Sequence, residues 1–177
     1  MVDFTPAIEI IKRFEGITDG DPTTVNLDPY LCPAGYWTIG WGHVVRDVYG
    51  KMIKGRENKL KAKAIYPYGI SKEQAHEMLV ADIRRVWVEL EQVLYEDGTI
   101  FSLNNNNQLC ALISFVFNIG VAAFKQSMLL QRLREGSLGA VPDQLKRWNK
   151  AGGKVLAGLK RRRAAEAELW LTPEGSA

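Results

Sequence analysis

The sequence predicts an α+β fold: a small N-terminal lobe with a short antiparallel β-sheet, joined by one long helix to a mainly helical C-terminal lobe. Three observations predict it. Residues 36–53 carry strand and turn signals, including a hairpin that turns near Gly50. Residues 71–94 have the apolar periodicity of one long helix. Beyond residue 105, helical patterns follow one another with short breaks.

The first predicted element is a helix with Thr5 as its cap and Pro6 at its first position. Apolar side chains then recur on one face, and Gly16 ends the helix. Glu15 therefore lies in the last turn, where the helix dipole disfavours a negative charge. This position favours the protonated carboxyl that a general acid needs. A solvated surface glutamate is the alternative interpretation.

Residues 36–42 predict a short strand. Because side chains alternate between faces, Trp37 and Ile39 are expected to pack on one side together with Trp41. Thr38 falls on the other side among glycines, which leave that face nearly bare. Glycines within a strand often mark the close approach of a ligand or another backbone. A simple hairpin strand would account for the pattern equally well.

The long helix is predicted from a capping box formed by Ser71 and Gln74. The segment before it, Lys54 to Gly69, is polar and rich in lysine and is expected to be a connector. One of Asn104 to Asn107 caps the next helix, which is apolar nearly all round, hence buried, and ends at Gly120. Further helices are expected at about 124–135, 142–149 and 159–170.

These elements predict a single domain over residues 1–177. One lobe would comprise about 14–70 and the other 1–13 plus 95–177, with the helix 71–94 linking them. A chain of 177 residues with 46% hydrophobic residues is long enough to bury a sizeable core.

Charge and cysteine content exclude several classes of function. A net charge of +3 is no nucleic-acid signature, and two cysteines, Cys32 and Cys110, give no disulfide framework. No segment is apolar enough for stable membrane insertion, and the N-terminus lacks signal-peptide features. The histidines are far apart in sequence, and the acidic segment Asp19–Asp28 lacks the pattern of a calcium loop. No metal or other cofactor is therefore expected.

Several motifs together resemble those of phage-type lysozymes (glycoside hydrolase family 24). Phe14-Glu15-Gly16 and the segment Tyr30–His43 are similar to the family's catalytic region. Residues 108–120 resemble its central buried helix, and residues 147–156 and 161–166 resemble its C-terminal signature. The resemblance covers nearly the whole chain and implies a lysozyme-like catalytic domain.

The resemblance implies that Glu15, Cys32 and Thr38 are the catalytic residues. The step from Cys32 to Thr38 fits the family pattern, whereas the step from Glu15 to Cys32 is longer than usual. Cys32 would orient or activate water or act as a thiolate nucleophile, but the sequence offers no cationic neighbour to lower its pKa. Asp28 is the first rival for this second role and Asp21 the second.

The implied activity is a muramidase, which hydrolyses the β-1,4 bond between N-acetylmuramic acid and N-acetylglucosamine in peptidoglycan. Phe117, Ser127 and Asn149 are the implied substrate-binding residues. A lytic transglycosylase and a catalytically silent wall-binding phage protein are the alternatives. The protein is expected to be a monomer that folds in the host cytoplasm, is released by a separate holin and acts on the cell wall in the periplasm.

Overall fold

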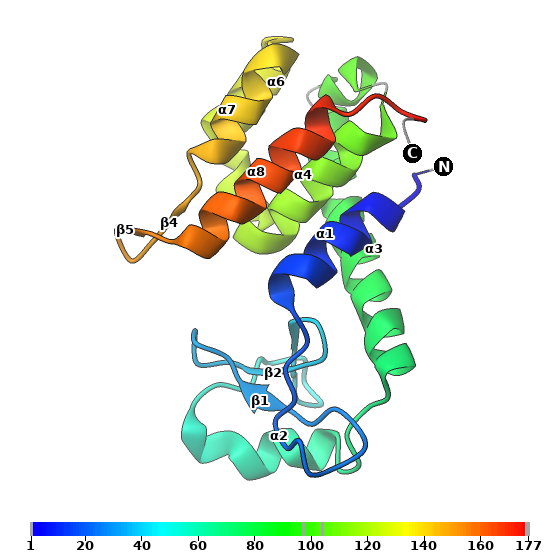
Figure 1. Cartoon of the computed structure of the whole chain (residues 1–177), viewed down its shortest axis with the longest axis vertical. Coiled ribbons are helices and arrows are strands. Elements are labelled where there is room, and N and C mark those ends of the chain that lie inside the picture. The colour runs from blue at the N-terminus through cyan, green and yellow to red at the C-terminus, as the bar shows by residue number, and fades with distance from the viewer. Residues whose placement is uncertain (1, 97, 104, 176–177) are drawn as a thin grey trace. The chain divides into compact units, whose positions relative to one another are not determined.

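The computed structural model describes residues 2–96, 98–103 and 105–175, and the chain divides into two compact units (Figure 1). Unit 2 is Glu15–Asp82, and unit 1 is formed by the described residues of Met1–Phe14 and Ile83–Ala177. The boundary falls within the long helix α3, Lys72–Glu96.

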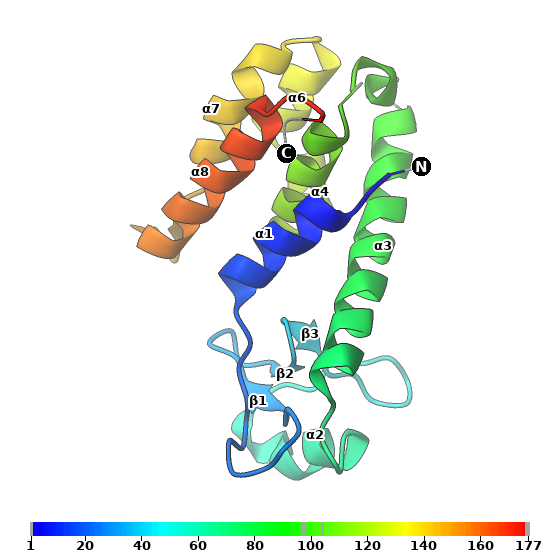
Figure 2. The same cartoon turned by 45° about the vertical axis from the view of Figure 1, so that its right-hand side comes forward.

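Unit 2 is built on a three-stranded antiparallel sheet in the order β1-β2-β3 (Figure 2). Its strands are β1 Tyr30–Leu31, β2 Trp37–Ile39 and β3 His43–Val44. Strand β2 ends at Ile39 because Gly40 turns the chain with a φ of +60°. Trp41 therefore lies beyond the strand, although it still packs, half-buried, against the core of the unit.

The core of unit 2 lies on one side of this sheet, where Trp37 and Ile39 are buried. The hairpin predicted around Gly50 is confirmed, because Asp47 N–H donates to the Lys51 carbonyl and Gly50 N–H donates to the Asp47 carbonyl. Apolar residues from the sheet, the hairpin and the helices that follow complete this core: Leu27, Val45, Ile53, Ala62, Ile70 and Ala75.

The segment expected to be a connector contains a short 3-10 helix, Arg56–Asn58, and the helix α2, Lys59–Ile65. The prediction of a plain connector is wrong because three lysines obscure the apolar face of α2. Ala62 is fully buried and Ile65 packs against the core of unit 2. Burial of these two side chains stabilises the helix, although the polar composition of the segment hides its helical pattern in the sequence.

The predicted cap of α3 is confirmed. Ser71 N–H donates to Gln74 Oε1 at 2.8 Å, and Gln74 N–H donates to Ser71 Oγ at 3.2 Å. The first helix, α1, is Thr5–Glu15. Its predicted cap is wrong, because Thr5 is already the first helical residue, and the Asp3 carboxylate accepts from both the backbone N–H and the hydroxyl of Thr5.

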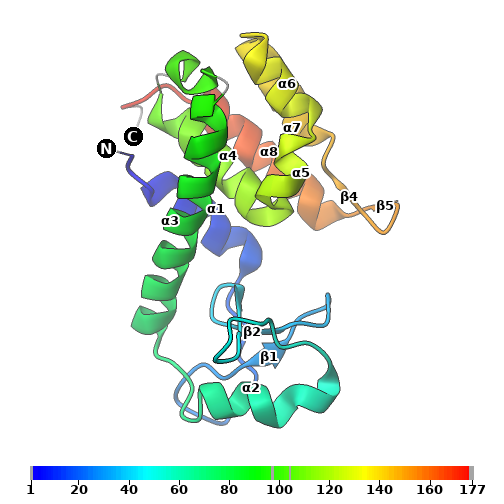
Figure 3. The same cartoon turned by 180° about the vertical axis from the view of Figure 1, so that it is seen from behind.

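Unit 1 is mainly helical, with α4 (Asn106–Ile119) and α8 (Ala157–Leu171) packed against each other and α7 (Val141–Lys146) packed against α8 (Figure 3). Asn105 caps α4 by accepting from Asn107 N–H at 2.7 Å, whereas Asn104 lies outside the described residues. Short 3-10 helices cover Thr99–Ser102 and Leu138–Ala140.

The helix expected at 124–135 is two helices, α5 (Val121–Lys125) and α6 (Met128–Arg134). They separate because Ser127 is extended, with a ψ of 147°, and caps α6.

A small hairpin of β4 (Lys150–Ala151) and β5 (Lys154–Val155) precedes α8. The α+β prediction is confirmed: the described chain is mainly helical with small antiparallel sheets. None of the helices in its described part has the length and apolar character needed to cross a bilayer.

Candidate active site

One face of the unit 2 sheet gathers two of the three predicted catalytic residues. Tyr30 stands opposite Thr38 in the β1–β2 pair, and Cys32 N–H continues the ladder by donating to the Tyr36 carbonyl at 2.9 Å. Opposite residues share a face, and so do residues two apart. Cys32 and Thr38 therefore lie on the face turned away from the Trp37 and Ile39 core.

Glu15 approaches the same sheet from the end of α1. A Cβ atom added to Gly42 would lie 3.5 Å from Glu15 Oε2, so the carboxyl group rests against the backbone just before β3. Gly42 has a φ of +81°, a conformation that side-chain-bearing residues rarely adopt. The glycine-rich stretch thus marks a close approach, and the group that approaches is the candidate general acid.

Cys32 follows β1 directly and is half-buried. Burial by itself raises the pKa of a thiol, but backbone N–H groups of Tyr36, Ala34 and Gly35, together with the Thr38 hydroxyl, outweigh it. They hold the pKa of Cys32 below its usual value. The sequence alone does not reveal this effect, because most of the donors are backbone groups of the tight β1–β2 turn rather than a cationic side chain.

Thr38 is only 3% exposed, so the prediction of open surroundings for it is wrong. Its hydroxyl donates to the Tyr36 carbonyl at 3.1 Å and also reaches the Cys32 sulfur. The neighbouring strands cover the position, because Thr38 pairs with Tyr30 on one side and Val44 on the other.

The rival carboxylates belong to a hydrogen-bonded loop. Asp28 is 6% exposed and accepts from the Thr24 hydroxyl at 2.7 Å, and Lys63 Nζ lies 4.0 Å from its Oδ1. Asp21 accepts from Thr23 and lies 3.6 Å from the same lysine ammonium. Both carboxylates are thus engaged in holding the loop, whereas Cys32 is aligned with Thr38.

The three predicted substrate-binding residues all belong to unit 1. Phe117 is a half-buried residue of α4, and Asn149 is half-buried between α7 and β4, where its Nδ2 donates to the Lys146 carbonyl at 3.0 Å. Ser127 caps α6: its Oγ accepts from Leu130 N–H at 3.1 Å and donates to the Phe124 carbonyl at 2.7 Å. Its single hydroxyl proton is therefore already used.

Tyr30 is a residue of this face that was not among the predicted site residues. The signal was available, because Tyr30 is two residues before Cys32 and therefore shares its face of a strand. Burial raises the pKa of the Tyr30 phenol. The Thr18 side chain opposes this as a hydrogen-bonding neighbour, and the negative charges of Glu15 and Cys32 raise the pKa further. The phenol hence lies within electrostatic reach of both groups.

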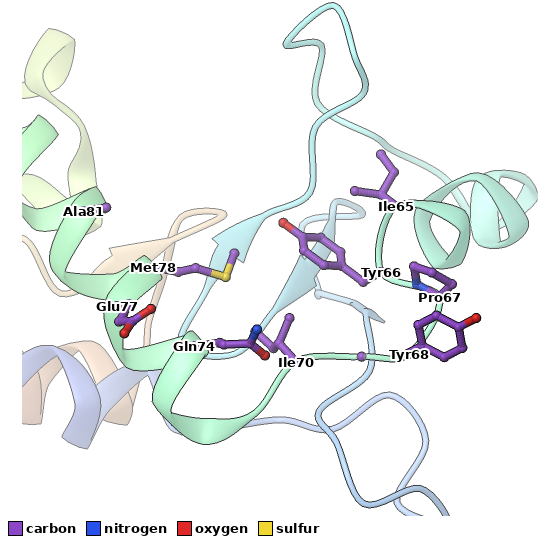
Figure 4. Close-up of a pocket in the computed structure, with 10 residues that line it drawn as sticks. Ile65, Tyr66, Pro67, Tyr68, Ile70, Gln74, Glu77, Met78 and Ala81 are labelled. Carbon is purple, nitrogen blue, oxygen red and sulfur yellow. The ribbon is translucent and has the colours of Figure 1, made fainter.

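A separate open pocket lies between the start of α3 and the segment that follows α2 (Figure 4). Tyr66, Met78, Gln74 and Glu77 are among its lining residues, whereas Glu15, Cys32 and Thr38 are not. The pocket is thus distinct from the catalytic set. Within the described ranges, no group of three or more histidine, cysteine or acidic side chains is arranged to hold a metal ion.

Comparisons with known proteins show the family to which the chain belongs. The family model described as phage lysozyme matches residues 13–166. An endolysin of Bacillus phage B103 is 33% identical over 94% of this chain and 53% of its own length. The chain thus spans about half the length of that relative. A SAR-endolysin of Enterobacteria phage PA-2 is 30% identical over 83% of this chain and 76% of its own.

A solved structure is also similar over nearly its whole length. It is the muramidase domain of SpmX from Asticaccaulis excentricus, with a TM-score of 0.66 and 27% sequence identity. The likeness covers 98% of this chain and 99% of that one. The lysozyme-like fold is therefore confirmed, and this chain belongs to the phage lysozyme family.

Proposed function

We propose that this protein is a muramidase that hydrolyses the β-1,4 bond between N-acetylmuramic acid and N-acetylglucosamine in peptidoglycan. One observation carries the proposal: Glu15 rests against Gly42, next to the sheet that aligns Cys32 and Thr38 on one face. An acid and a water-orienting pair on one small sheet are the parts that glycoside hydrolysis needs. Family membership and the similar muramidase domain support the same activity.

Glu15 is the proposed general acid. Its carboxyl proton passes to the glycosidic oxygen as the bond from that oxygen to the anomeric carbon breaks. Glu15 is the last residue of α1, and its carboxyl lies against the backbone just before β3.

Cys32 and Thr38 are proposed to prepare the attacking water. The Cys32 thiolate accepts one proton of the water, the Thr38 oxygen fixes its direction, and the water oxygen bonds to the anomeric carbon. The hydrogen-bond donors that lower the pKa of Cys32 support the thiolate form. Direct attack by the thiolate is the other route, and the anomeric configuration of the first product distinguishes the two.

Phe117, Ser127 and Asn149 are proposed to bind the sugar chain. Phe117 offers a partly exposed ring to a sugar face, and Asn149 offers an amide. Because the Ser127 proton is directed to the Phe124 carbonyl, Ser127 would accept a hydrogen bond from an acetamido N–H rather than donate one.

The central test compares Glu15→Gln with Glu9→Gln on purified peptidoglycan. Glu9 is an exposed residue of the same helix and serves as the matched control. Glu15→Gln should lower the rate of clearing by about 10²–10⁴-fold, the usual contribution of a general acid. Its circular dichroism and its sedimentation with intact walls should match wild type. Clearing by Glu15→Gln at the wild-type rate would refute the assignment.

The second group is tested by comparing Cys32→Ala with Asp28→Asn. Cys32→Ala should abolish most of the activity, whereas Asp28→Asn should act mainly on stability because it weakens the contact with Thr24. The reverse result would transfer the role to Asp28.

Product analysis separates the alternatives. A muramidase leaves reducing ends, whereas a lytic transglycosylase leaves anhydro ends and needs no positioned water. A silent wall-binding protein would sediment with walls and release no fragments, and the Glu15 variant would behave like wild type. Mass spectrometry of the released fragments distinguishes all three.

We further propose that the protein acts as a monomer on the periplasmic face of the wall after release from the host cytoplasm by a holin. The second route is release without a holin. Expression with and without a holin, followed by lysis, tests the proposal. Lysis at the same rate in both cultures would favour the second route.

A further inference from the structure

Tyr30 belongs to the proposed catalytic face of the sheet. It is the cross-strand partner of Thr38, and it lies two residues before Cys32 on the same face of the sheet. Leu31, between them, points the other way and packs against the core of unit 2. The phenol of Tyr30 is therefore not needed to fill that core.

The surroundings of the phenol are polar and charged. Tyr30 is half-buried, the Thr18 side chain is its hydrogen-bonding neighbour, and the charges of Glu15 and Cys32 both act on it. Burial and these two negative charges raise the pKa of the phenol, so Tyr30 stays neutral and keeps its proton at any pH at which an enzyme of this kind works. A neutral phenol is a hydrogen-bond donor.

The proposed reaction moves one negative charge past this donor. At the start the charge is on the Cys32 thiolate and Glu15 is protonated. When the glycosidic bond has broken, Cys32 holds a proton from water and Glu15 has given its proton to the leaving oxygen. The charge has then passed from sulfur to carboxylate, and a negative charge at either position acts on the Tyr30 phenol.

We propose that Tyr30 is a positioning residue of this reaction, whose hydroxyl donates first to the Cys32 thiolate and then to the Glu15 carboxylate, with Thr18 directing the phenol between them. The inference rests on the proposed function. A donor already in place where charge develops needs no reorganisation during the reaction, which is how preorganised groups accelerate catalysis.

The test is the pH dependence of kcat for Tyr30→Phe. The phenol favours the charged form of both partners, so its removal favours both protonated forms. The reaction needs the Cys32 thiolate together with the protonated carboxyl of Glu15, so both limbs of the profile should move to higher pH. The maximal kcat should fall about ten- to a hundredfold, as expected for a lost hydrogen bond to a charged group, with KM unchanged.

Tyr66→Phe is the matched control, because Tyr66 is another half-buried tyrosine of unit 2 whose phenol pKa is raised by burial. It should leave the profile in place. Thr18→Val provides a second variant that keeps the phenol, and it should shift both limbs in the same direction by a smaller amount. If Tyr30→Phe does not fold, the Thr18→Val profile decides.

The possible failures are distinguishable. If wild type releases no reducing ends from peptidoglycan, the proposed function is wrong. If wild type is active and the profiles of Tyr30→Phe and Thr18→Val superimpose on it, only the role of Tyr30 is wrong. A uniform loss of kcat at every pH, with a lowered melting temperature, would likewise overturn the inference, since packing alone explains it.

Discussion

The Nδ1 atom of His43 lies 2.7 Å from Oδ2 of Asp82, so the first residue of β3 is tied to α3. Both side chains are largely shielded from solvent, with 22% and 15% exposed. His43 follows Gly42, the residue against which Glu15 rests. The pair therefore fixes the stretch of backbone that supports the candidate acid.

A double-mutant cycle should detect this coupling. His43→Asn and Asp82→Asn should each lower the free energy of unfolding, and the double variant should lose less than the sum of the two. The expected coupling is about 0.5–3 kcal/mol, as for residues in direct contact. Urea denaturation at pH 6 measures it. Strict additivity would show that the two side chains do not stabilise one another.

The two cysteines should differ sharply in reactivity. Burial raises the pKa of Cys110 to about 11, and its sulfur also contacts the Asp3 carbonyl. The pKa of Cys32 is lowered by its hydrogen-bond donors, so its thiolate fraction is larger at every pH below the usual thiol pKa. Iodoacetamide at pH 7 should therefore modify Cys32 and spare Cys110, as peptide mass spectrometry can follow. Equal labelling would contradict the stabilised thiolate.

Alkylation of Cys32 should slow as the pH falls, because protonation removes the thiolate. Thr38→Val removes one donor, raises the pKa of Cys32 and should slow alkylation at pH 7. Thr24→Val, a substitution in the loop that binds Asp28, is the matched control and should leave the rate unchanged.

A buried charge cluster should dominate the stability of unit 1. Glu166 is fully buried, its Oε1 accepts from the Ser114 hydroxyl at 2.8 Å, and its carboxylate pairs with Arg162 at 3.2 Å and Arg163 at 3.0 Å. Glu166→Gln leaves two buried guanidinium groups with less compensation, so the free energy of unfolding should fall by about 3–5 kcal/mol. Glu168→Gln, an exposed change on the same helix, is the control. Equal unfolding midpoints for the two variants would show that the Glu166 carboxylate does not stabilise unit 1.

Ser127→Ala should affect stability and substrate binding separately. Loss of the α6 cap should lower the free energy of unfolding by about 1 kcal/mol. If the hydroxyl oxygen also accepts from an acetamido group, KM should rise while kcat stays the same. Ser127→Gly also removes the hydroxyl, but glycine at a helix N-cap lowers the free energy of unfolding less than alanine does. A rise in KM with little loss of stability in Ser127→Gly would therefore separate the two effects. An unchanged KM in both variants would leave Ser127 with the cap alone.

The sequence predicted the elements whose signals are local. The capping box of Ser71 and Gln74, the apolar face of α1 and the buried helix α4 depend on residues within a few turns of one another, and all three occur as predicted. Helix α2 escaped prediction because its lysines mask a short apolar face that only the core of unit 2 makes favourable.

The candidate site divides in the same way. The sequence by itself determined which residue types stand in the family's catalytic pattern, Glu15, Cys32 and Thr38, because a motif is a property of the chain. Tertiary structure alone decided that Thr38 is buried, that backbone donors lower the pKa of Cys32, and that Tyr30 joins the face. These three facts depend on strand register and on a tight turn, which bring the side chains of the face and the backbone donors close together. The interactions between such groups weaken steeply with distance, so the chain sequence alone does not reveal them.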